Sequence, residues 1–340
     1  YQHETSRRWQ PGIRWRRVIA DTDRTNIVSE DLAELIAGRP LGESGAESVF
    51  EQMLAGTLDD AQIGALLGMI QARGPSVDEL VGAARVMRRH VEKVPTPDDP
   101  TRPIIDTCGT GGGRSTFNIS TTATFVVAGA GVAVAKHGNR SSTSKSGSAD
   151  VLEALGARID LAPDAVARCL EETGLGYMFA PAHHPAFRHI VPVRRALGVR
   201  TIFNLLGPLT NPAGAPRQLI GVADPAYLER MARALAILGC ERALIVHGRD
   251  GMDEVSTGAV TDVVAVGGPR GRASLPRVRP TPRGSPGSLR RRRLPPAQPG
   301  APPPGARRAA PAASTRAPRA PPADAPPLTS SPPRTPHPTH

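Results

Sequence analysis

Strand-like and helix-like stretches alternate between residues 103 and 266, and this alternation restricts the fold more than any other feature. PIIDTCG (103–109) and VAVAKHG (132–138) read as short buried strands, and STTATFVVAGAG (120–131) and SADVLEALG (148–156) as helices. RALIVHG (242–248) and VTDVVAV (260–266) follow as further strands. Strands that alternate with helices predict an α/β domain with a mostly parallel central sheet flanked by helices.

A smaller helical domain is expected before this sheet. Four stretches, listed last, have apolar residues at three- and four-residue steps with no strand between them. Ser29 is expected to cap the first, and Gly38 and Gly56 to end the first two. The proline-rich VPTPDDPTRP (94–103) then reads as a linker. The four stretches are SEDLAELIAG (29–38), GAESVFEQMLAG (45–56), DDAQIGALLGMIQARG (59–74) and SVDELVGAARVMRRHVE (76–92).

The basic character of the chain lies in its last part. The formal net charge is +11, but residues 267–340 hold 14 arginines and one acid, Asp324, which leaves −2 for the other 266 residues. The same segment holds 21 of the 36 prolines and no aromatic residue, so it buries too little apolar surface to order itself. A natural disordered tail and a gene read in a shifted frame would both give this composition. In either case the α/β domain is expected to lack its final part, so the strand at 260–266 would have no covering helix.

These observations predict a domain order. Residues 1–27 are expected to be a disordered extension, 28–98 the helical domain, 99–266 the α/β domain and 267–340 the Pro/Arg/Ala-rich tail. No stretch reaches 18 uninterrupted apolar residues, and the basic first 26 residues lack the apolar core of a signal peptide. The three cysteines, Cys108, Cys169 and Cys240, have neither metal-ligand nor disulfide spacing, which suits a reducing cytoplasm.

Glycines cluster where the first strand of the α/β domain ends. DTCGTGGGRSTFNIST (106–121) has four glycines in five positions and then a run of hydroxyl residues that opens a helix. A glycine-rich turn between a strand and a helix directs backbone N–H groups at one point, where the helix dipole also favours an anion. A plain tight turn explains many such clusters, so the motif is weak evidence by itself.

Two further loops strengthen the prediction. KHGNRSSTSKSGSAD (136–150) gathers cations and hydroxyl donors after a second strand, which suits phosphate oxygens, although a solvated polar loop is the plain alternative. GMDEVS (251–256) sets Asp253 beside Glu254 after the strand at 242–248. Adjacent carboxylates near a polyphosphate suit Mg²⁺, whereas an acidic pair on a loop is usually surface charge. Loops after parallel strands meet at one edge of the sheet, where open α/β sheets bind ligands.

Five motifs together resemble one family. GTGG…TFNIST, KHGNRSSTSKSGSADVLEALG, FAPAHHPAFRH, VRRALGVRTIFNLLGPLTNP and HGRDGMDEVS are similar to those of the anthranilate phosphoribosyltransferases of tryptophan biosynthesis, over about residues 28–266. The resemblance implies the nucleoside phosphorylase/phosphoribosyltransferase-like fold. It implies transfer of a phosphoribosyl group from phosphoribosyl diphosphate to the amine of anthranilate, with Mg²⁺ as cofactor, and a homodimer that binds neither membrane nor nucleic acid.

The resemblance also implies site residues. Lys136, His137 and Arg194 are expected to take part in catalysis, and Ser120, Asp253 and Glu254 to hold Mg²⁺. Anthranilate is expected to contact Gly109, Asn139, His184 and Arg194. The phosphoribosyl diphosphate site is expected to comprise Gly109, Gly112, Gly113, Thr116, Asn118, Ile119, Ser120, Thr121, Lys136, His137, Gly138, Asn139, Arg140, Ser141, Ser142, Thr143, Ser144 and Ser148.

The chain departs from the family in its glycine loop. The family usually has an acidic residue after GTGG, where this chain has Gly113 followed by Arg114. Two other functions stay open at this point. One is a nucleic-acid-binding relative that uses the basic tail, and the other is a pyrimidine nucleoside phosphorylase, whose loop does not resemble KHGNR.

Overall fold

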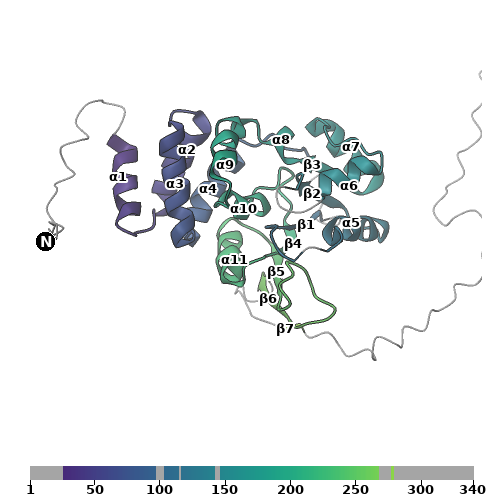
Figure 1. Cartoon of the computed structure of the whole chain (residues 1–340). Helices are drawn as coiled ribbons and strands as arrows, with labels where there is room; N and C mark the ends of the chain where they lie inside the picture. The colour runs from purple at the N-terminus through teal and green to yellow at the C-terminus, as the bar shows by residue number, and fades with distance from the viewer. Residues whose placement is uncertain (1–25, 97–102, 115, 142–145, 268–276, 279–340) are drawn as a thin grey trace, which may run out of the picture. The chain divides into compact units, whose positions relative to one another are not determined.

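The computed structural model describes residues 26–96, 103–114, 116–141, 146–267 and 277–278 (Figure 1). A seven-stranded sheet in the order β3-β2-β1-β4-β5-β6-β7 forms the centre of the α/β part. The predicted fold class, a helical domain followed by a mostly parallel sheet flanked by helices, is confirmed. The predictions made for residues 1–25 and for most of the tail concern residues outside those that the structure describes.

Four helices precede the sheet: α1 (Asn26–Ile36), α2 (Glu43–Ala55), α3 (Asp60–Arg73) and α4 (Val77–Arg89). Asp59 and Ser76 accept the backbone N–H groups of the first turns of α3 and α4, and each forms a full capping box. Gly56 ends α2 in the left-handed conformation, with φ of 70°. Helices α2 and α4 pack against each other through buried side chains that include Phe50 and Met53.

Helix α1 begins earlier than the sequence analysis expected. Ser29 was predicted as its N-cap, but the helix starts three residues before it, at Asn26. Val28 continues the four-residue spacing of Leu32 and Ile36 towards the N-terminus, so the apolar period of this helix does not stop at the serine. The expected cap is therefore wrong.

Five parallel strands carry the site. They are β1 (Ile105–Gly109), β2 (Val134–Gly138), β3 (Leu175–Phe179), β4 (Arg217–Gly221) and β5 (Arg242–Gly248). Pairing is parallel in β1–β2, β1–β4, β2–β3 and β4–β5, and antiparallel where β6 (Thr261–Val266) joins β5. The strands β3 and β4 were not predicted, because Gly176 interrupts the apolar run of LGYMF, and RQLIG begins with two polar residues, so neither has a strict alternation of apolar residues.

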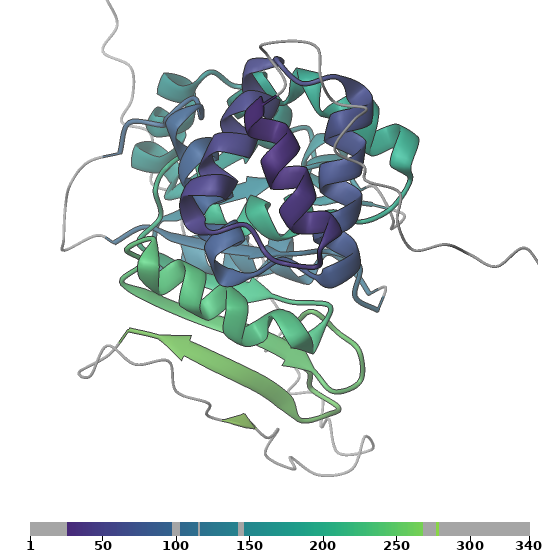
Figure 2. The same ribbon diagram turned by 90° about the vertical axis from the view of Figure 1, so that its left-hand side faces the viewer.

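The edge of the sheet differs from the expectation in two respects. The last predicted strand was expected to lack a covering helix, but α11 (Leu228–Ile237) packs on both β5 and β6 (Figure 2). Within the predicted disordered tail, β7 (Arg277–Val278) pairs antiparallel with Thr261 and Asp262 of β6. Arg277 and Val278 thus cover part of the outer edge of β6, and covering an edge in this way protects it from pairing with another chain.

Other helices flank the remaining strands. Helix α5 (Ile119–Gly129) packs on β1, β2 and β3, and α7 (Pro163–Thr173) packs on β3. The connecting segments are α6 (Ser148–Ala154), α8 (Ala180–His183), α9 (Val191–Leu197), α10 (Phe203–Leu206) and three 3₁₀ turns at Pro185–His189, Gly207–Leu209 and Pro225–Tyr227. None of the described helices combines the length and the apolar run that crossing a bilayer requires.

One apolar core joins the helical domain to the sheet. It extends from Phe50 and Leu66 of the helical domain through Phe203 to Ile220 and Ile245 of the strands. Arg88 of α4 reinforces this junction, because its guanidinium donates hydrogen bonds to the carbonyl oxygens of Leu209 (2.8 Å) and Leu238 (2.9 Å). The segments that carry the site therefore pack on one hydrophobic core shared by the helical domain and the sheet.

Candidate active site

The predicted loops meet at one edge of the sheet. Strands β1 and β4 end side by side, with Gly109 paired to Gly221, and β2 ends at Gly138 beside Phe179 of β3. The glycine-rich turn, the KHGNR loop and the segment after β5 follow these carboxyl ends. The parallel pairing therefore brings together three loops that lie up to about 150 residues apart in the sequence, as the ligand-binding edge of an open α/β sheet requires.

The glycine-rich turn, residues 109–113, is fixed at Thr110. The Thr110 N–H donates to the carbonyl of Gly221 (2.9 Å), and its hydroxyl accepts from the N–H of Ala223 (3.2 Å). Gly111 and Gly112 are exposed and have φ of 64° and 85°, where a side chain is strained. The turn thus leaves bare backbone open to solvent, as an anion site needs.

Asp253 lies directly against this turn. A Cβ atom placed on Gly113 would be 2.2 Å from Asp253 Oδ1, and one on Gly221 would be 1.7 Å from the Asp253 carbonyl oxygen. No side chain fits at position 113 in this arrangement. The structure therefore gives a physical reason for glycine where the family usually has an acid: the space beside the turn is taken by the carboxylate of Asp253.

Lys136, Ser120 and Glu254 form the adjoining cluster. Lys136 is 3% exposed, and its Nζ donates to the carbonyl of Thr107 and to Ser120 Oγ (3.2 Å). Burial lowers the pKa of Lys136, although the carboxylates around it oppose this effect. Burial and the neighbouring Asp253 raise the pKa of Glu254 to about 7, against the favourable effects of Lys136 and of the Ser120 backbone N–H.

This cluster fits a divalent cation. A carboxyl group whose pKa lies near 7 is short of positive charge, and a metal ion supplies that charge in place of a proton. Ser120, Asp253 and Glu254 offer the oxygen ligands that Mg²⁺ prefers, and Mg²⁺ commonly completes its shell with phosphate oxygens and water. The predicted metal ligands thus lie together beside the turn.

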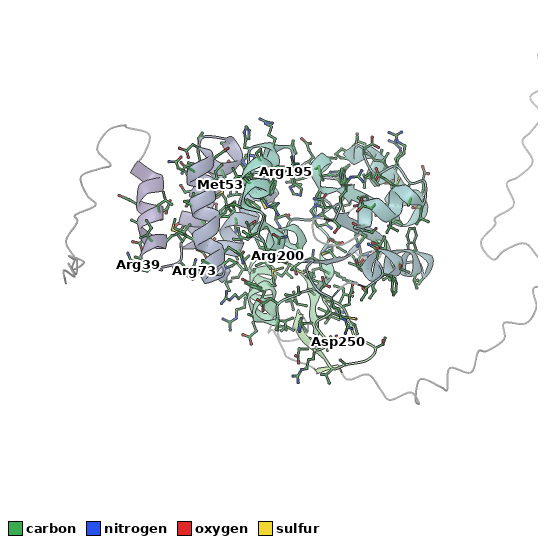
Figure 3. The ribbon with its side chains drawn as sticks, viewed as in Figure 1. Arg39, Met53, Arg73, Arg195, Arg200 and Asp250 are labelled. Carbon is green, nitrogen blue, oxygen red and sulfur yellow. The ribbon has the colours of Figure 1, made fainter. Side chains whose placement is uncertain are left out.

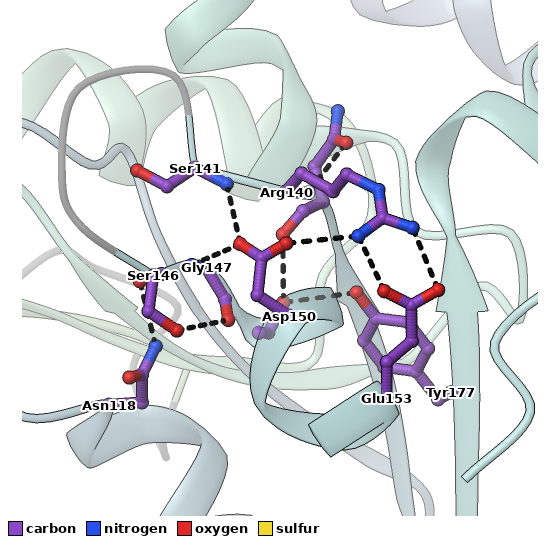
Figure 4. A network of polar contacts seen from close by, with 10 residues as sticks. Asn118, Arg140, Ser141, Ser146, Gly147, Asp150, Glu153 and Tyr177 are labelled. Atoms are coloured by element: carbon purple, nitrogen blue, oxygen red, sulfur yellow. Dashed lines mark hydrogen bonds and ion pairs between the residues drawn. The ribbon is translucent and has the colours of Figure 1, made fainter. Parts of the chain in front are cut away.

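The loop that follows β2, residues 139–147 (the KHGNR loop), contacts Asp150 of α6 through its described residues Arg140, Ser141 and Gly147 (Figure 4). The Asp150 carboxylate accepts from the N–H groups of Gly147 (2.7 Å) and Ser141 (3.3 Å) and from Arg140 Nη1 (3.0 Å). Arg140 also forms a two-pronged ion pair with Glu153. Its charge is thus already paired, and these contacts raise the pKa of Arg140 further.

Two contacts tie this loop to its neighbours. Asn118, at the start of α5, donates from Nδ2 to the Ser146 carbonyl (3.1 Å), which links the loop to the glycine-rich turn (Figure 4). Ser148 Oγ donates to the carbonyl of Asn139 (3.3 Å) and shares a hydrogen bond with the hydroxyl of Tyr177 (3.1 Å). Burial raises the pKa of Tyr177 to about 12, so this hydroxyl stays protonated.

A second cluster, made of imidazoles and aromatic rings, lies beside Lys136. The ring centroids of His137 and His184 are 5.1 Å apart, and those of His184 and Phe187 are 5.8 Å apart. Phe187 packs edge-on against Phe203, over which the guanidinium of Arg194 lies 5.3 Å from the ring centroid. Burial lowers the pKa of Arg194, and the described residues offer it no carboxylate partner.

The two imidazoles of this cluster are neutral. Burial and the neighbouring histidines lower the pKa of His137 to about 3 and that of His184 to about 4. His137 Nδ1 lies 3.1 Å from the carbonyl of Gly207 and must carry the proton there, which leaves Nε2 as an acceptor. The buried Nε2 atoms of both rings have no hydrogen-bond partner among the residues that the structure describes.

The other predicted site residues fall in different places. Thr116 is exposed, Ile119 is half-buried and Thr121 is buried in the first turn of α5. Ser142, Thr143 and Ser144 lie outside the described residues. A cavity of about 500 Å³ lies at the opposite end of the strands, beside Ile105, Arg217 and Leu244, and includes none of the predicted site residues.

Sequence reasoning missed several residues that hold the site. Asp106 is buried, accepts the His137 N–H (3.3 Å) and Asn211 Nδ2 (2.8 Å), and has a pKa raised by burial. Arg200 donates to the Thr110 carbonyl (3.0 Å). Asp106 stood within the quoted glycine motif, but nothing in the sequence linked it to position 211. Only the fold reveals these contacts.

Comparison with known proteins agrees with this architecture. Residues 30–91 match the family model "Glycosyl transferase family, helical bundle domain", and residues 101–282 match "Glycosyl transferase family, a/b domain". The anthranilate phosphoribosyltransferase of Rubrobacter xylanophilus is 55% identical over 243 residues, which are 71% of this chain and 70% of the relative. That of Symbiobacterium thermophilum is 54% identical over 234 residues, or 68% and 67% of the two chains.

Solved structures give the same result. The anthranilate phosphoribosyltransferase of Thermus thermophilus superposes with a TM-score of 0.64 at 44% identity, over 72% of each chain. The enzyme of Saccharomyces cerevisiae in complex with PRPP and Mg superposes with a TM-score of 0.67 at 26% identity, over 76% of this chain and 74% of that one. The sequence, the fold and these similarities agree, and the chain belongs to the anthranilate phosphoribosyltransferase family.

Proposed function

We propose that the chain transfers the phosphoribosyl group of 5-phosphoribosyl 1-diphosphate to the amine of anthranilate, giving N-(5-phosphoribosyl)anthranilate and diphosphate in tryptophan biosynthesis. The convergence of Ser120, Lys136, Asp253 and Glu254 on the glycine-rich turn carries the proposal. It supplies oxygen ligands for a cation, a buried positive charge and free backbone amides at one point. That combination suits a departing diphosphate.

The donor side of the site answers the main difficulty of the reaction. Breaking the bond between ribose C1 and the diphosphate oxygen leaves negative charge on diphosphate and positive charge on ribose. Mg²⁺, held by Ser120, Asp253 and Glu254, would neutralise diphosphate oxygens when bound. Lys136 and the amides of residues 111–113 stabilise the remaining charge, and the contacts of Lys136 with Thr107 and of Thr110 with Gly221 and Ala223 already hold these groups in place.

The rest of the donor is assigned to the two loops. The N–H groups at the start of α5 and the hydroxyls of Thr116, Ser120 and Thr121 face or flank the diphosphate side. The KHGNR loop and Ser148 enclose the sugar and its phosphate. The paired state of Arg140 supports an orienting role, in which the guanidinium holds the loop against α6 through Glu153 instead of meeting phosphate directly.

The acceptor side suits an aromatic acid. Arg194 lies half-buried over Phe203 without a carboxylate partner among the described residues, so the carboxylate of anthranilate can take that place in a two-pronged hydrogen bond. Asn139 and Gly109 border the same space from the ends of their strands. The aromatic edges of Phe187 and His184 match the ring of the acceptor.

The histidines orient the amine and do not remove its proton in a strong-base step. An imidazole with a pKa of about 3 is a weak base, so His137 contributes a hydrogen-bond acceptor through its unpartnered Nε2. Anthranilate's amine is already a nucleophile and needs only to be held in line with C1. After the C–N bond has formed and the C1–O bond has broken, the nitrogen gives its surplus proton to water or to an oxygen of the departing diphosphate.

A fluorescence assay tests the proposal. We expect anthranilate fluorescence to fall when the folded chain is mixed with phosphoribosyl diphosphate and Mg²⁺, and to stay constant when EDTA removes the cation. Circular dichroism establishes that the sample is folded. Constant fluorescence in a folded, Mg²⁺-containing sample would contradict the proposal.

The alternatives predict other results. A nucleoside phosphorylase would consume thymidine or uridine with phosphate, and a nucleic-acid-binding relative would show salt-sensitive DNA binding lost on removal of residues 267–340. The names of the relatives favour the transferase over both alternative functions.

We also propose that the chain forms a homodimer and is located in the cytoplasm. The unpaired state of the cysteines at 108, 169 and 240 fits a reducing compartment.

A further inference from the structure

Arg200 lies in the segment that joins α9 to α10. Gly198 ends α9 in the left-handed conformation, with φ of 64°, and the next residues turn towards the sheet. The N–H of Thr201 donates to Asn204 Oδ1 (3.0 Å), and Thr201 and Ile202 are buried. The backbone on one side of Arg200 is therefore anchored. Figure 3 labels Arg195 on α9 and Arg200 after the end of that helix, near the centre of the described part of the chain.

The guanidinium of Arg200 reaches the glycine-rich turn. Its Nη2 donates to the Thr110 carbonyl at 3.0 Å, and its Nη1 lies 2.0 Å from where a Cβ on Gly112 would be. The guanidinium thus contacts the turn on both sides of Gly111, at the Thr110 carbonyl and beside the Gly112 Cα. Gly112 has φ of 85°, and its missing side chain leaves the space that Arg200 fills.

These contacts complete the fixation of the turn. Thr110 is held by Gly221 and Ala223 at the end of β4, and the N–H of Arg114, which follows the turn, donates to the Gly251 carbonyl (2.9 Å). Between these anchors the described residues show only a long hydrogen bond within the turn, from the Thr110 hydroxyl to the Gly111 carbonyl (3.4 Å), and glycine has the largest conformational freedom to lose. Arg200 restrains the turn at this weakest point.

The same short segment reaches both substrate sites. Arg194, at its start, faces the proposed acceptor site over Phe203, and Arg200 holds the proposed diphosphate turn six residues later. Phe203 itself is buried and follows directly after Ile202. A shift of this segment therefore moves the acceptor wall and the donor turn together.

We propose that Arg200 is a positioning residue that holds the 109–113 turn in its diphosphate-binding conformation and couples that turn to the acceptor site. The proposal rests on the proposed function for its kinetic consequence. The restraint of the turn itself is a property of the fold and is measurable without turnover.

Three variants test it: Arg200→Met, Arg200→Lys and, as a matched control, Arg195→Met on the exposed side of α9. Losing one hydrogen bond from a charged donor predicts a rise in the KM for phosphoribosyl diphosphate on the order of tenfold in Arg200→Met. The KM for anthranilate should rise less. Arg200→Lys should recover part of the loss, millimolar guanidinium should restore Arg200→Met, and Arg195→Met should match wild type.

Hydrogen exchange tests the restraint of the turn separately from its kinetic consequence. Amides of peptides that cover residues 109–114 should exchange faster in Arg200→Met than in wild type or Arg195→Met. If the wild-type chain shows no turnover but this exchange difference appears, the proposed function fails and the restraint stands. Unchanged exchange of the turn overturns the proposal, as does a KM for phosphoribosyl diphosphate within twofold of an active wild type.

Discussion

Replacing Lys136 with methionine removes a positive charge from the centre of the proposed site while keeping a side chain of similar length. Lys136 is 3% exposed and donates to the Thr107 carbonyl and to Ser120 Oγ. We expect kcat to fall by roughly 10²–10³, or about 3–4 kcal/mol, which is the usual effect of removing one oriented group that stabilises charge in the transition state.

The stability of the folded chain should change much less than the rate. Leaving the buried Thr107 carbonyl without its donor costs about 1–3 kcal/mol, whereas removing a buried ammonium group relieves its desolvation. The two effects oppose each other, so we expect a loss of stability no larger than about 2 kcal/mol, which lowers Tm by roughly 4–8 °C for a chain of this size.

The variant should also change the pH dependence of stability. Lys136 lowers the pKa values of Asp106 and Glu254, which burial raises, so both rise further in Lys136→Met. A raised folded-state pKa penalises the ionised form, and that penalty appears as pH rises above the unfolded value near 4. The destabilisation of the variant should therefore be small at pH 4 and grow towards neutral pH.

Steady-state fluorescence kinetics and calorimetry measure these effects on one preparation. Lys93→Met is the matched control, because Lys93 is exposed and its side chain forms no hydrogen bond or ion pair with the described residues of the site. A folded Lys136→Met protein that retains more than a tenth of the wild-type kcat would refute the role of this charge in diphosphate departure. An equal loss in Lys93→Met would point to a general effect of charge instead.

Three further predictions concern the metal, the acceptor and the helical domain. Because burial raises the pKa of Glu254 to about 7, protons compete with Mg²⁺ for this carboxylate below pH 7. Titration calorimetry should therefore show the Mg²⁺ affinity falling up to tenfold per pH unit below 7, and Glu254→Gln should abolish that pH dependence. A wild-type affinity that does not change with pH argues against Glu254 as a ligand. Arg194→Gln should raise the KM for anthranilate by about 10–100-fold with little change for the donor, and an effect confined to the donor contradicts the acceptor assignment. Glu79→Ala should lower the free energy of unfolding by about 3–5 kcal/mol, because the fully buried Glu79 carboxylate accepts hydrogen bonds from Leu41, Arg73 and Ser76. A loss under about 1 kcal/mol in denaturant titration would show that the helical domain does not depend on these hydrogen bonds.

Local patterns were enough to predict the class of the fold. The alternation of strands and helices and the glycine at 56 have a sequence signature, and Gly56 ends α2 as predicted. The expected cap at Ser29 failed because apolar periodicity continued past it. The strands β3 and β4 were missed because Gly176 interrupts one apolar run and Arg217 and Gln218 open the other, so neither stretch has a clear period of two.

Residues of the site were predictable where side chains suited to one ligand are adjacent in the sequence. Asp253 and Glu254 are adjacent in sequence, and the parallel sheet explains how they reach the glycine-rich turn. The contact of Arg200 with Thr110 spans 90 residues and has no local pattern. The neutral state of His137 likewise follows from burial by distant segments, which a sequence motif does not specify.

Crystals soaked with Mn²⁺ and phosphoribosyl diphosphate test the central claim most directly, because anomalous scattering locates the metal without reference to activity. The account predicts a peak within ligand distance of Asp253 and Glu254, with the diphosphate against the backbone of residues 109–113 and near Lys136. A diphosphate bound at another face of the sheet, or a metal peak away from both carboxylates, would contradict it.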